Sequence, residues 1–498
     1  MTAIFAGRRA EDREENTMVP ALVLRNSGDV YSLINSGRLR PRRATMVAAV
    51  ALGSIFLDGW DLGSFGIGTV QISHTFHLDK SSNFGFQSLP FLSAAVLMGA
   101  LVGGLVGGYF TDRLGRRKMF LFDLILLFAV TILSATAPTV ELFWFWRFMM
   151  GVAVGMDVPV ALAFIAEFNA ISTKGRNVML AQVMSTGASV VLFLVMIPIY
   201  AAGVGDSLWR YAIGLGAIPA AIVLVLRFFY TSESPMWSAA HEDLDHAAEI
   251  IKQTYYADEI AVQPDHRQDE GQTRRAVVRP GAILELFKTP YGIRTLLVSV
   301  LVVTQAVEFY GISLYTPKIL TALLGDRIEL VLLLSAVANM FGVIGAVLCV
   351  MNVQRLGIRH LAVMGYAVTF GCLAVISGAY PLLAVPVATG LIWIFYAGHN
   401  FGPGYAGTAM GSLSYPTGIR GISGGYTQAI TRVGGIIGAY AFPVLLSAVG
   451  QRATIGYIAL APLIGLLFVL LIKWDPIGKD VEVAPQRIEA SRAESSSR

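Results

Sequence analysis

Long apolar segments are the feature that most constrains the fold of this chain. Segments of about twenty apolar residues are what an α-helix needs to cross a bilayer, and they recur about twelve times between Thr45 and Lys473. Only 14% of the residues are charged, against about a quarter in a soluble domain. We therefore predict an all-α, multi-pass membrane protein. We place the spans at 45–72, 87–110, 119–137, 141–168, 177–201, 208–230, 293–323, 328–351, 360–380, 382–412, 421–449 and 452–474.

The spans form two groups of six, separated by a hydrophilic stretch. We predict an N-terminal tail (1–44), a first six-helix half (45–230), a central loop (231–290), a second half (291–474) and a C-terminal tail (475–498). Lys and Arg gather on alternate short loops, which places the central loop and both termini in the cytoplasm. The N-terminal tail has no apolar run before a small-residue cleavage site, so we expect no secretory signal peptide. We expect residues 11–15 and 484–498 to be disordered.

Several function classes are excluded by what the sequence lacks. The net charge of +4 is small and scattered, so we expect no nucleic-acid partner. The two cysteines, Cys349 and Cys372, lie inside apolar runs and suggest neither a disulfide nor a metal site. No catalytic constellation or phosphate-binding loop is visible. We therefore expect no enzymatic activity, no metal and no cofactor, and a protein that acts as a monomer on a small solute in the bilayer.

An internal repeat points to a transporter. The stretch from Asp112 to Arg117 after the second span is echoed by the stretch from Gln354 to Arg359 after the eighth, six spans later. The two halves are therefore parallel structural repeats. Many transporters are built from such repeats and hold the solute near the bilayer midplane, where the repeats meet. A channel or a receptor has no need of this duplication.

The stretch from Gly108 to Lys118 resembles the cytoplasmic signature of the major facilitator superfamily. The resemblance implies the major facilitator fold, with about twelve transmembrane helices in two pseudo-symmetric halves. It also implies a conformational latch, in which acids and bases pair across the halves in one state and separate in the other. The alternative is a basic loop whose only role is to set the orientation of the helices in the membrane. The predicted latch residues are Gly108, Asp112, Arg113, Gly115, Arg116, Arg117, Glu167, Lys174, Glu233, Arg355 and Arg420.

More specific motifs resemble the sugar-transporter group of this superfamily. The stretch from Met149 to Gly155, followed by Glu167 and Lys174, is similar to the signature of the fourth and fifth helices of that group. The segments at 232–237 and 415–421 resemble its segments after the sixth and before the eleventh helix. The sequence departs from the pattern of this group at two places. Leu413 stands where the group usually has a Glu, and the paired Gln that true sugar porters have in the seventh helix is not reproduced around Gln305.

Two other motifs resemble symporters of acids. The stretch from Asp58 to Asp61 is similar to the Asp-Gly-aromatic-Asp motif of aromatic-acid and phosphate:proton symporters, and the stretch from Gly155 to Pro159 resembles a motif of phosphate symporters. We therefore predict a proton-coupled symporter of a small polar metabolite, either an organic or aromatic acid or a sugar. A phosphate symporter and an exporter of drugs or metabolites are the alternatives.

Ionisable residues near the bilayer centre normally face a cavity, because a buried charge costs several kcal/mol. Asp58 and Asp61 lie three residues apart on one helix face, so we expect one of them to carry the coupling proton. Asp157 in the fourth span is a third candidate, for proton or solute. The alternative for Asp58 and Asp61 is a pair locked by a base, and for Asp157 an acid satisfied by backbone groups or by Arg147.

Solute contacts are predicted from both halves at the same depth. A guanidinium binds a carboxylate or phosphate through two parallel hydrogen bonds, which makes Arg432 the candidate anion ligand; the alternative is that it only neutralises an acid. His399 is more simply explained as a structural imidazole. The predicted solute-binding residues are Asp157, Gln305, Glu308, Tyr310, Asn400 and Arg432.

Two competing functions lack their expected signals. Drug:proton antiporters of this superfamily carry a Gly-Pro-rich stretch in the fifth helix, and the stretch from Val183 to Val191 does not show it. A membrane enzyme or a transporter-like sensor would need a catalytic cluster or a large soluble domain. We expect a location in the plasma membrane, in a bacterial inner membrane.

Overall fold

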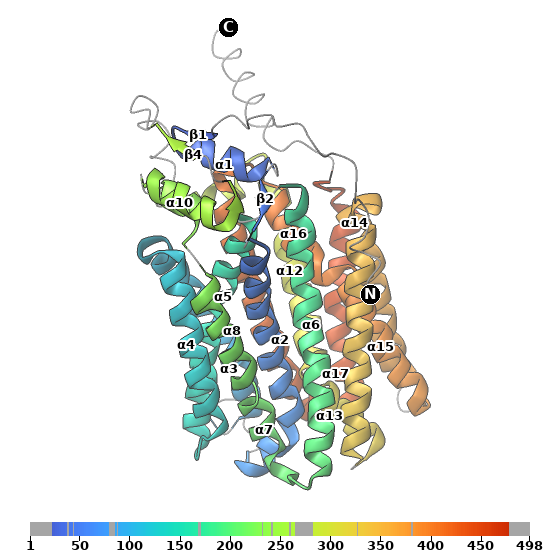
Figure 1. Cartoon of the computed structure of the whole chain (residues 1–498). Coiled ribbons are helices and arrows are strands. Elements are labelled where there is room, and N and C mark those ends of the chain that lie inside the picture. Colours follow the sequence, from blue (N-terminus) through green and yellow to red (C-terminus); the bar gives the residue numbers. More distant parts are fainter. Residues whose placement is uncertain are drawn as a thin grey trace, which may run out of the picture.

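The structure is a computed structural model, and it describes most of the chain. The described residues are 22–36, 39–42, 44–78, 85–86, 88–167, 171–231, 233–240, 243–257, 260–263, 282–325, 327–379 and 382–477. They form a bundle of long helices that carries short strands at one end only (Figure 1). Helices satisfy their own backbone hydrogen bonds, which a bilayer interior requires. The predicted all-α class is confirmed.

The first half consists of α2 (Ala44–Thr75), α3 (Leu89–Leu114), α4 (Arg116–Ala135), α5 (Val140–Glu167), α6 (Ile171–Ala201), the 3-10 turn η1 (Gly205–Ser207), α7 (Leu208–Gly214) and α8 (Ala217–Tyr230). The second half consists of α12 (Gly292–Ser313), α13 (Thr316–Leu324), α14 (Ile328–Ala379), α15 (Val385–Phe401), α16 (Pro403–Leu413) and α17 (Thr417–Leu471). These elements match the predicted spans to within several residues. Some spans consist of two consecutive helices, whereas α14 and α17 each cover two spans.

Two helices are each long enough to cross the bilayer twice. α14 has 52 residues and α17 has 55, and at about 1.5 Å per residue each exceeds twice the hydrocarbon thickness of about 30 Å. Both break at a glycine with positive φ, Gly357 at 78° and Gly450 at 76°. Five single apolar spans and these two double ones, with α2, α5 and the α15–α16 pair, account for the twelve predicted crossings.

Small residues bring helices into direct backbone contact. A Cβ at Gly99 or Gly103 of α3 would overlap the backbone of Phe148 or Val152 in α5. Gly434 and Gly438 of α17 lie in the same way against the backbone of α12. Such close approach is how helices pack tightly in lipid.

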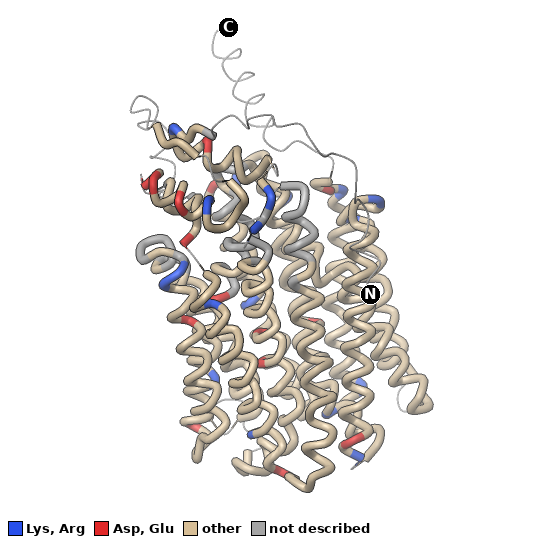
Figure 2. Tube along the Cα trace, in the orientation of Figure 1, with Lys and Arg blue, Asp and Glu red and all other residues tan. Residues whose placement is uncertain are grey.

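A hydrophilic cap covers one end of the bundle. It contains β1 (Leu22–Leu24), α1 (Ser27–Asn35), β2 (Arg40–Pro41), α9 (Pro235–Ala240), α10 (Leu244–Thr254), β3 (Tyr255–Tyr256), β4 (Ile260–Val262) and the 3-10 turn η3 (Ala282–Phe287). β1 pairs in parallel with β4, and β2 pairs antiparallel with β3. The N-terminal tail and the central loop were predicted as separate segments, whereas these strands join them. Charged residues are dense in this cap and sparse along the bundle (Figure 2).

The two halves meet along α3 and α17 and along α6 and α14. Ser93 Oγ in α3 donates a hydrogen bond of 3.0 Å to the Ala439 carbonyl in α17. Gly66 of α2 lies close to the Leu314 carbonyl, between α12 and α13. These bridging contacts lie in the end of the bundle opposite the cap.

Candidate solute and proton site

Asp58 lies in the middle of α2, on the side that faces the second half. Gly59 next to it allows α2 to touch the Ser185 carbonyl of α6, since any side chain there would overlap that backbone. Asp58 is half-buried, and its buried Oδ1 meets no hydrogen-bond donor among the described residues. It interacts electrostatically with Arg432 of the second half and with Asp157 of its own half. Asp58 therefore lies between the two halves, as its predicted role requires.

Asp61 lies one turn further along α2 and is buried, with 3% of its surface exposed. Its charged neighbour is Arg147 of α5, with which it interacts electrostatically. Arg147 Nη1 lies 3.4 Å from the Asp61 backbone carbonyl, and its guanidinium sits 5.2 Å from the centre of the Phe65 ring. Asp61 Oδ2 is buried without a donor among the described residues. This buried acid therefore lies beside a positive charge of its own half.

Arg432 of α17 faces Asp58 from the second half. It is half-buried and shares a hydrogen bond with the hydroxyl of Tyr310 in α12. Gly435, one turn further along α17, leaves room for the Tyr310 ring. Arg432, Tyr310 and Asp58 therefore form one polar group that spans the two halves.

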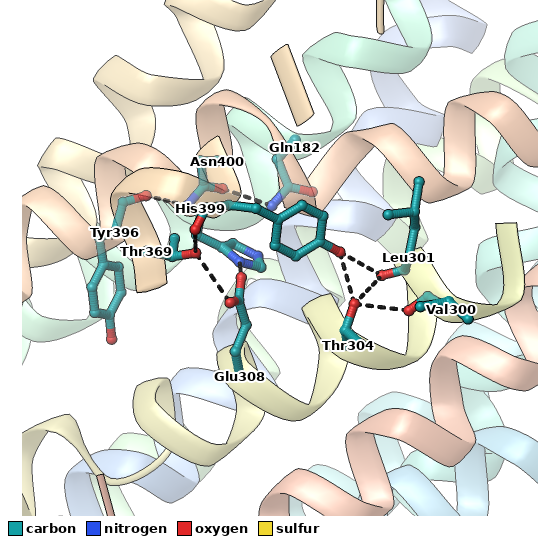
Figure 3. Close-up of polar contacts among 10 residues, drawn as sticks. Gln182, Val300, Leu301, Thr304, Glu308, Thr369, Tyr396, His399 and Asn400 are labelled. Atoms are coloured by element: carbon teal, nitrogen blue, oxygen red, sulfur yellow. Dashed lines mark hydrogen bonds and ion pairs between the residues drawn. The ribbon is translucent and has the colours of Figure 1, made fainter. Parts of the chain in front are cut away.

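A second polar contact crosses between the halves at Asn400 of α15 (Figure 3). Its Oδ1 accepts hydrogen bonds from Gln182 Nε2 at 2.9 Å and from Thr186 Oγ1 at 3.3 Å, both in α6. Its own amide nitrogen donates to the Tyr396 carbonyl. An amide and a hydroxyl at the interface between the halves are groups that a hydroxylated solute can replace.

Glu308 of α12 is engaged inside the second half (Figure 3). It is fully buried, its Oε1 lies 2.8 Å from His399 Nδ1, and its Oε2 accepts a 3.2 Å hydrogen bond from Thr369. His399 stacks on Phe309 with ring centres 4.4 Å apart. Gln305, one turn before Glu308, is also buried. Both oxygens of Glu308 thus have protein partners, as the structural alternative for His399 predicts.

Asp157 of α5 has a different partner from the one considered in the sequence analysis. Its Oδ1 lies 2.6 Å from Nη2 of Arg227 in α8, and Arg147 instead contacts α2. Arg227 also binds Asp123 of α4 at 2.8 Å. Neither Arg227 nor Asp123 was among the predicted site residues, although each is a charge within an apolar span.

Three residues of the predicted latch, Gly115, Arg117 and Glu233, form a turn in the first half. Glu233 accepts hydrogen bonds from the backbone N–H of Arg117, at 3.3 Å and 3.2 Å, beside Gly115 with its φ of 92°. A carboxylate at a helix N-terminus is favourable because it meets the positive end of the helix dipole. Glu233 thereby ties the cap to the start of α4.

The second half repeats this arrangement. Asp475 accepts a 2.9 Å hydrogen bond from the backbone N–H of Arg359, beside Gly357 with its φ of 78°. Arg355 is exposed. Pairing of the remaining latch side chains across the halves stays a prediction, because the structure describes the helices that carry them but not these side chains. They are Asp112, Arg113, Arg116, Glu167, Lys174 and Arg420, and the same holds for the surroundings of Gly108.

The Sugar (and other) transporter family model matches residues 46–482, which is most of the chain. The chain belongs to this family. It is similar to the putative metabolite transport protein YaaU of Escherichia coli, with 26% identity over 83% of this chain and 88% of that protein. It is also similar to a D-xylose transporter of Levilactobacillus brevis, with 25% identity over 82% of this chain and 90% of that one. A transporter rather than an enzyme is therefore shown.

Solved structures show the same fold. The inward-open structure of the xylose transporter XylE from E. coli superimposes with a TM-score of 0.71 at 20% identity, covering 88% of this chain and 98% of that chain. A structure of the proton:xylose symporter XylE bound to 6-bromo-6-deoxy-D-glucose gives a TM-score of 0.69 at 19% identity. The predicted major facilitator fold and the multi-pass membrane topology are confirmed.

Proposed function

We propose that this transporter is a proton-coupled symporter of a small polar metabolite, with an organic or aromatic acid ahead of a sugar. It works by alternating access, as a monomer, in the plasma membrane with both termini in the cytoplasm, and the proton is its coupling ion. The observation that carries the proposal is the group formed by Asp58, Tyr310 and Arg432. It joins an acid of the first half to a base of the second.

The proton and an anion bind this group together for a simple electrostatic reason. With Asp58 ionised, Arg432 has a counter-charge across the interface. When Asp58 takes up a proton, Arg432 is left as a half-buried cation without that partner. A carboxylate of the solute then replaces it, with the two parallel hydrogen bonds that a guanidinium offers. Proton binding thus favours binding of an anionic solute.

A neutral polyol or sugar is the second candidate. The contact of Asn400 with Gln182 and Thr186 offers amide and hydroxyl groups between the halves, and such groups recognise hydroxyls. The relatives named as a D-xylose transporter and as myo-inositol transporter 1 of Candida albicans also support a neutral solute. The two candidates use different residues, so they can be separated by mutation.

A thermal-shift screen of the purified protein tests the solute class. The probes are benzoate, D-gluconate, phosphate, D-xylose and myo-inositol, each added to the wild type and to Arg432→Gln. We expect benzoate or gluconate to raise the melting temperature of the wild type and not of Arg432→Gln. The matched control is Arg452→Gln, an exposed arginine of the same helix. An increase with xylose or inositol that survives Arg432→Gln supports the neutral candidate.

Uptake into proteoliposomes under an imposed pH gradient tests the coupling. We expect Asp58→Asn to abolish uphill accumulation of the solute found in the screen while exchange of that solute across the membrane continues. Asp206→Asn, at an exposed acid of the same half, serves as the control. Undiminished proton-driven accumulation by Asp58→Asn would refute the role of Asp58.

A further inference from the structure

Arg227 of α8 is the centre of a buried cluster that the proposed transport cycle does not use. Its Nη1 lies 2.8 Å from Asp123 Oδ1 of α4, and its Nη2 lies 2.6 Å from Asp157 Oδ1 of α5. The exposed fractions of Arg227, Asp123 and Asp157 are 0%, 1% and 4%. The guanidinium also binds Ser54 Oγ and the Phe120 carbonyl and lies over the Phe120 ring. Four helices of the first half therefore surround a single positive charge.

The cluster holds one base and two acids, so its charges do not balance if both acids are ionised. Leaving one charge uncompensated in the interior costs several kcal/mol. The two carboxyl groups bind the same guanidinium, so they also lie close to each other. Asp123 Oδ2 is buried and meets no N–H or O–H donor among the described residues. Two ionised carboxylates repel, whereas two carboxyls that share a proton attract.

We propose that Asp123 and Asp157 share one proton and form, with Arg227, a proton-binding site distinct from the Asp58–Asp61 pair. With that proton in place the cluster is neutral, and each acid keeps its contact with the guanidinium. Without it, one negative charge is buried among apolar helices. The site lies wholly within the first half, so it can hold its proton in every orientation of the two halves.

The cluster also has a route to the interface between the halves. The polar groups that face it are Ser54 and Asp58 from α2, the Phe120 carbonyl and Asp123 from α4, Asp157 from α5 and Arg227 from α8. Of these, Asp58 is the half-buried one, and it interacts electrostatically with Asp157. Protons therefore reach the shared site through Asp58. Only this route, and not the existence of the site, rests on the proposed proton coupling.

Infrared spectroscopy of the purified protein tests the site without any solute. A protonated carboxyl in an apolar surrounding has a carbonyl stretch that shifts in D2O and is separate from that of a carboxylate. We expect this component at neutral pH in the wild type and a smaller one in both Asp123→Asn and Asp157→Asn, since each variant leaves one acid paired with Arg227. The control Asp206→Asn keeps the full component. An undiminished component in either single variant would overturn the proposal.

The pH dependence of thermal unfolding gives a second readout. The folded protein holds a proton that an unfolded carboxylate releases, so its stability falls as pH rises from mildly acidic to mildly alkaline. Asp123→Asn imitates the protonated acid and keeps the Arg227–Asp157 pair, so it should fold and lose this part of the pH dependence. A pH profile of Asp123→Asn that is identical to the wild type would contradict the shared proton. Failure of uphill transport alone would affect the proposed function and not this site.

Discussion

Each half of the transporter holds a buried polar cluster, and the two clusters differ in chemistry although the backbones are repeats. In the first half, Arg227 stands between two carboxylates at 2.8 Å and 2.6 Å. In the second half, Glu308 meets His399 at 2.8 Å. The first cluster contains a base that is always charged, whereas the imidazole of the second can be neutral. The duplication thus preserved the architecture, and each half has its own ionisable groups.

The turns at Gly115 and Gly357 show the opposite behaviour. Gly115 with Glu233 in the first half, and Gly357 with Asp475 in the second, repeat the same positive-φ glycine and the same acid on the following helix N-terminus. The acid follows its glycine at the same sequence separation in both halves. The turns are therefore shared structure, while the membrane clusters are specific to each half. Mutations should accordingly have unequal effects in the clusters and equal effects in the turns.

The largest effect is expected from Arg227→Met. Removing the base leaves Asp123 and Asp157 buried without a counter-charge, which should destabilise the protein by about 3–5 kcal/mol. The measurement is the melting temperature in detergent, with Arg327→Met at an exposed position as the control. Adding Asp157→Asn to Arg227→Met should recover part of the loss. A melting temperature equal to that of Arg327→Met would show that Arg227 does not stabilise the protein by neutralising the two acids.

A smaller effect is expected from His399→Phe in the second half. Phenylalanine keeps the stacking on Phe309 but leaves Glu308 Oε1 without its donor, which should cost about 1–3 kcal/mol. Glu308→Gln, which retains a hydrogen-bonding side chain, should cost less. The measurement is again the melting temperature. If His399→Phe proved as costly as Arg227→Met, the two clusters would be energetically equivalent and the contrast between them would fail.

Equal effects are expected from Gly115→Ala and Gly357→Ala. Both glycines have positive φ, at 92° and 78°, with extended ψ, and a side chain in such a conformation costs about 1–3 kcal/mol. A Cβ would also press on the carboxylate of Glu233 or of Asp475. Gly424→Ala is the control, because that glycine has open space around it. Clearly different losses of melting temperature in the two halves would show that the turns are not equivalent.

The sequence predicted the fold well, for physical reasons. Apolar length identifies a membrane crossing, and the repeated stretches at Asp112 and Gln354 identify the duplication. It also placed Asp58 and Arg432 at one depth, because depth follows from position along a span. These inferences need only one helix at a time.

Partners were harder to predict, because they depend on how helices are rotated and packed. Arg147 was considered as a partner of Asp157, whereas the structure brings Arg227 to it from the sixth crossing. Glu308 was predicted as a solute contact, and its hydrogen bonds with His399 and Thr369 were not predicted. The pairing of the N-terminal tail with the central loop was missed for the same reason, since a two- or three-residue strand has no sequence period of its own.

The smallest effect is expected from Glu233→Gln and Asp475→Asn, which remove the charge of each capping acid and keep its size. A carboxylate at a helix N-terminus contributes about 0.3–1 kcal/mol where it is exposed to solvent, and salt screens that contribution. We expect both variants to lower the melting temperature slightly, by similar amounts, and the difference from wild type to shrink at high salt. A salt-independent loss in one half alone would mean that its acid acts through hydrogen-bond geometry rather than charge. The two turns would then have diverged, as the membrane clusters did.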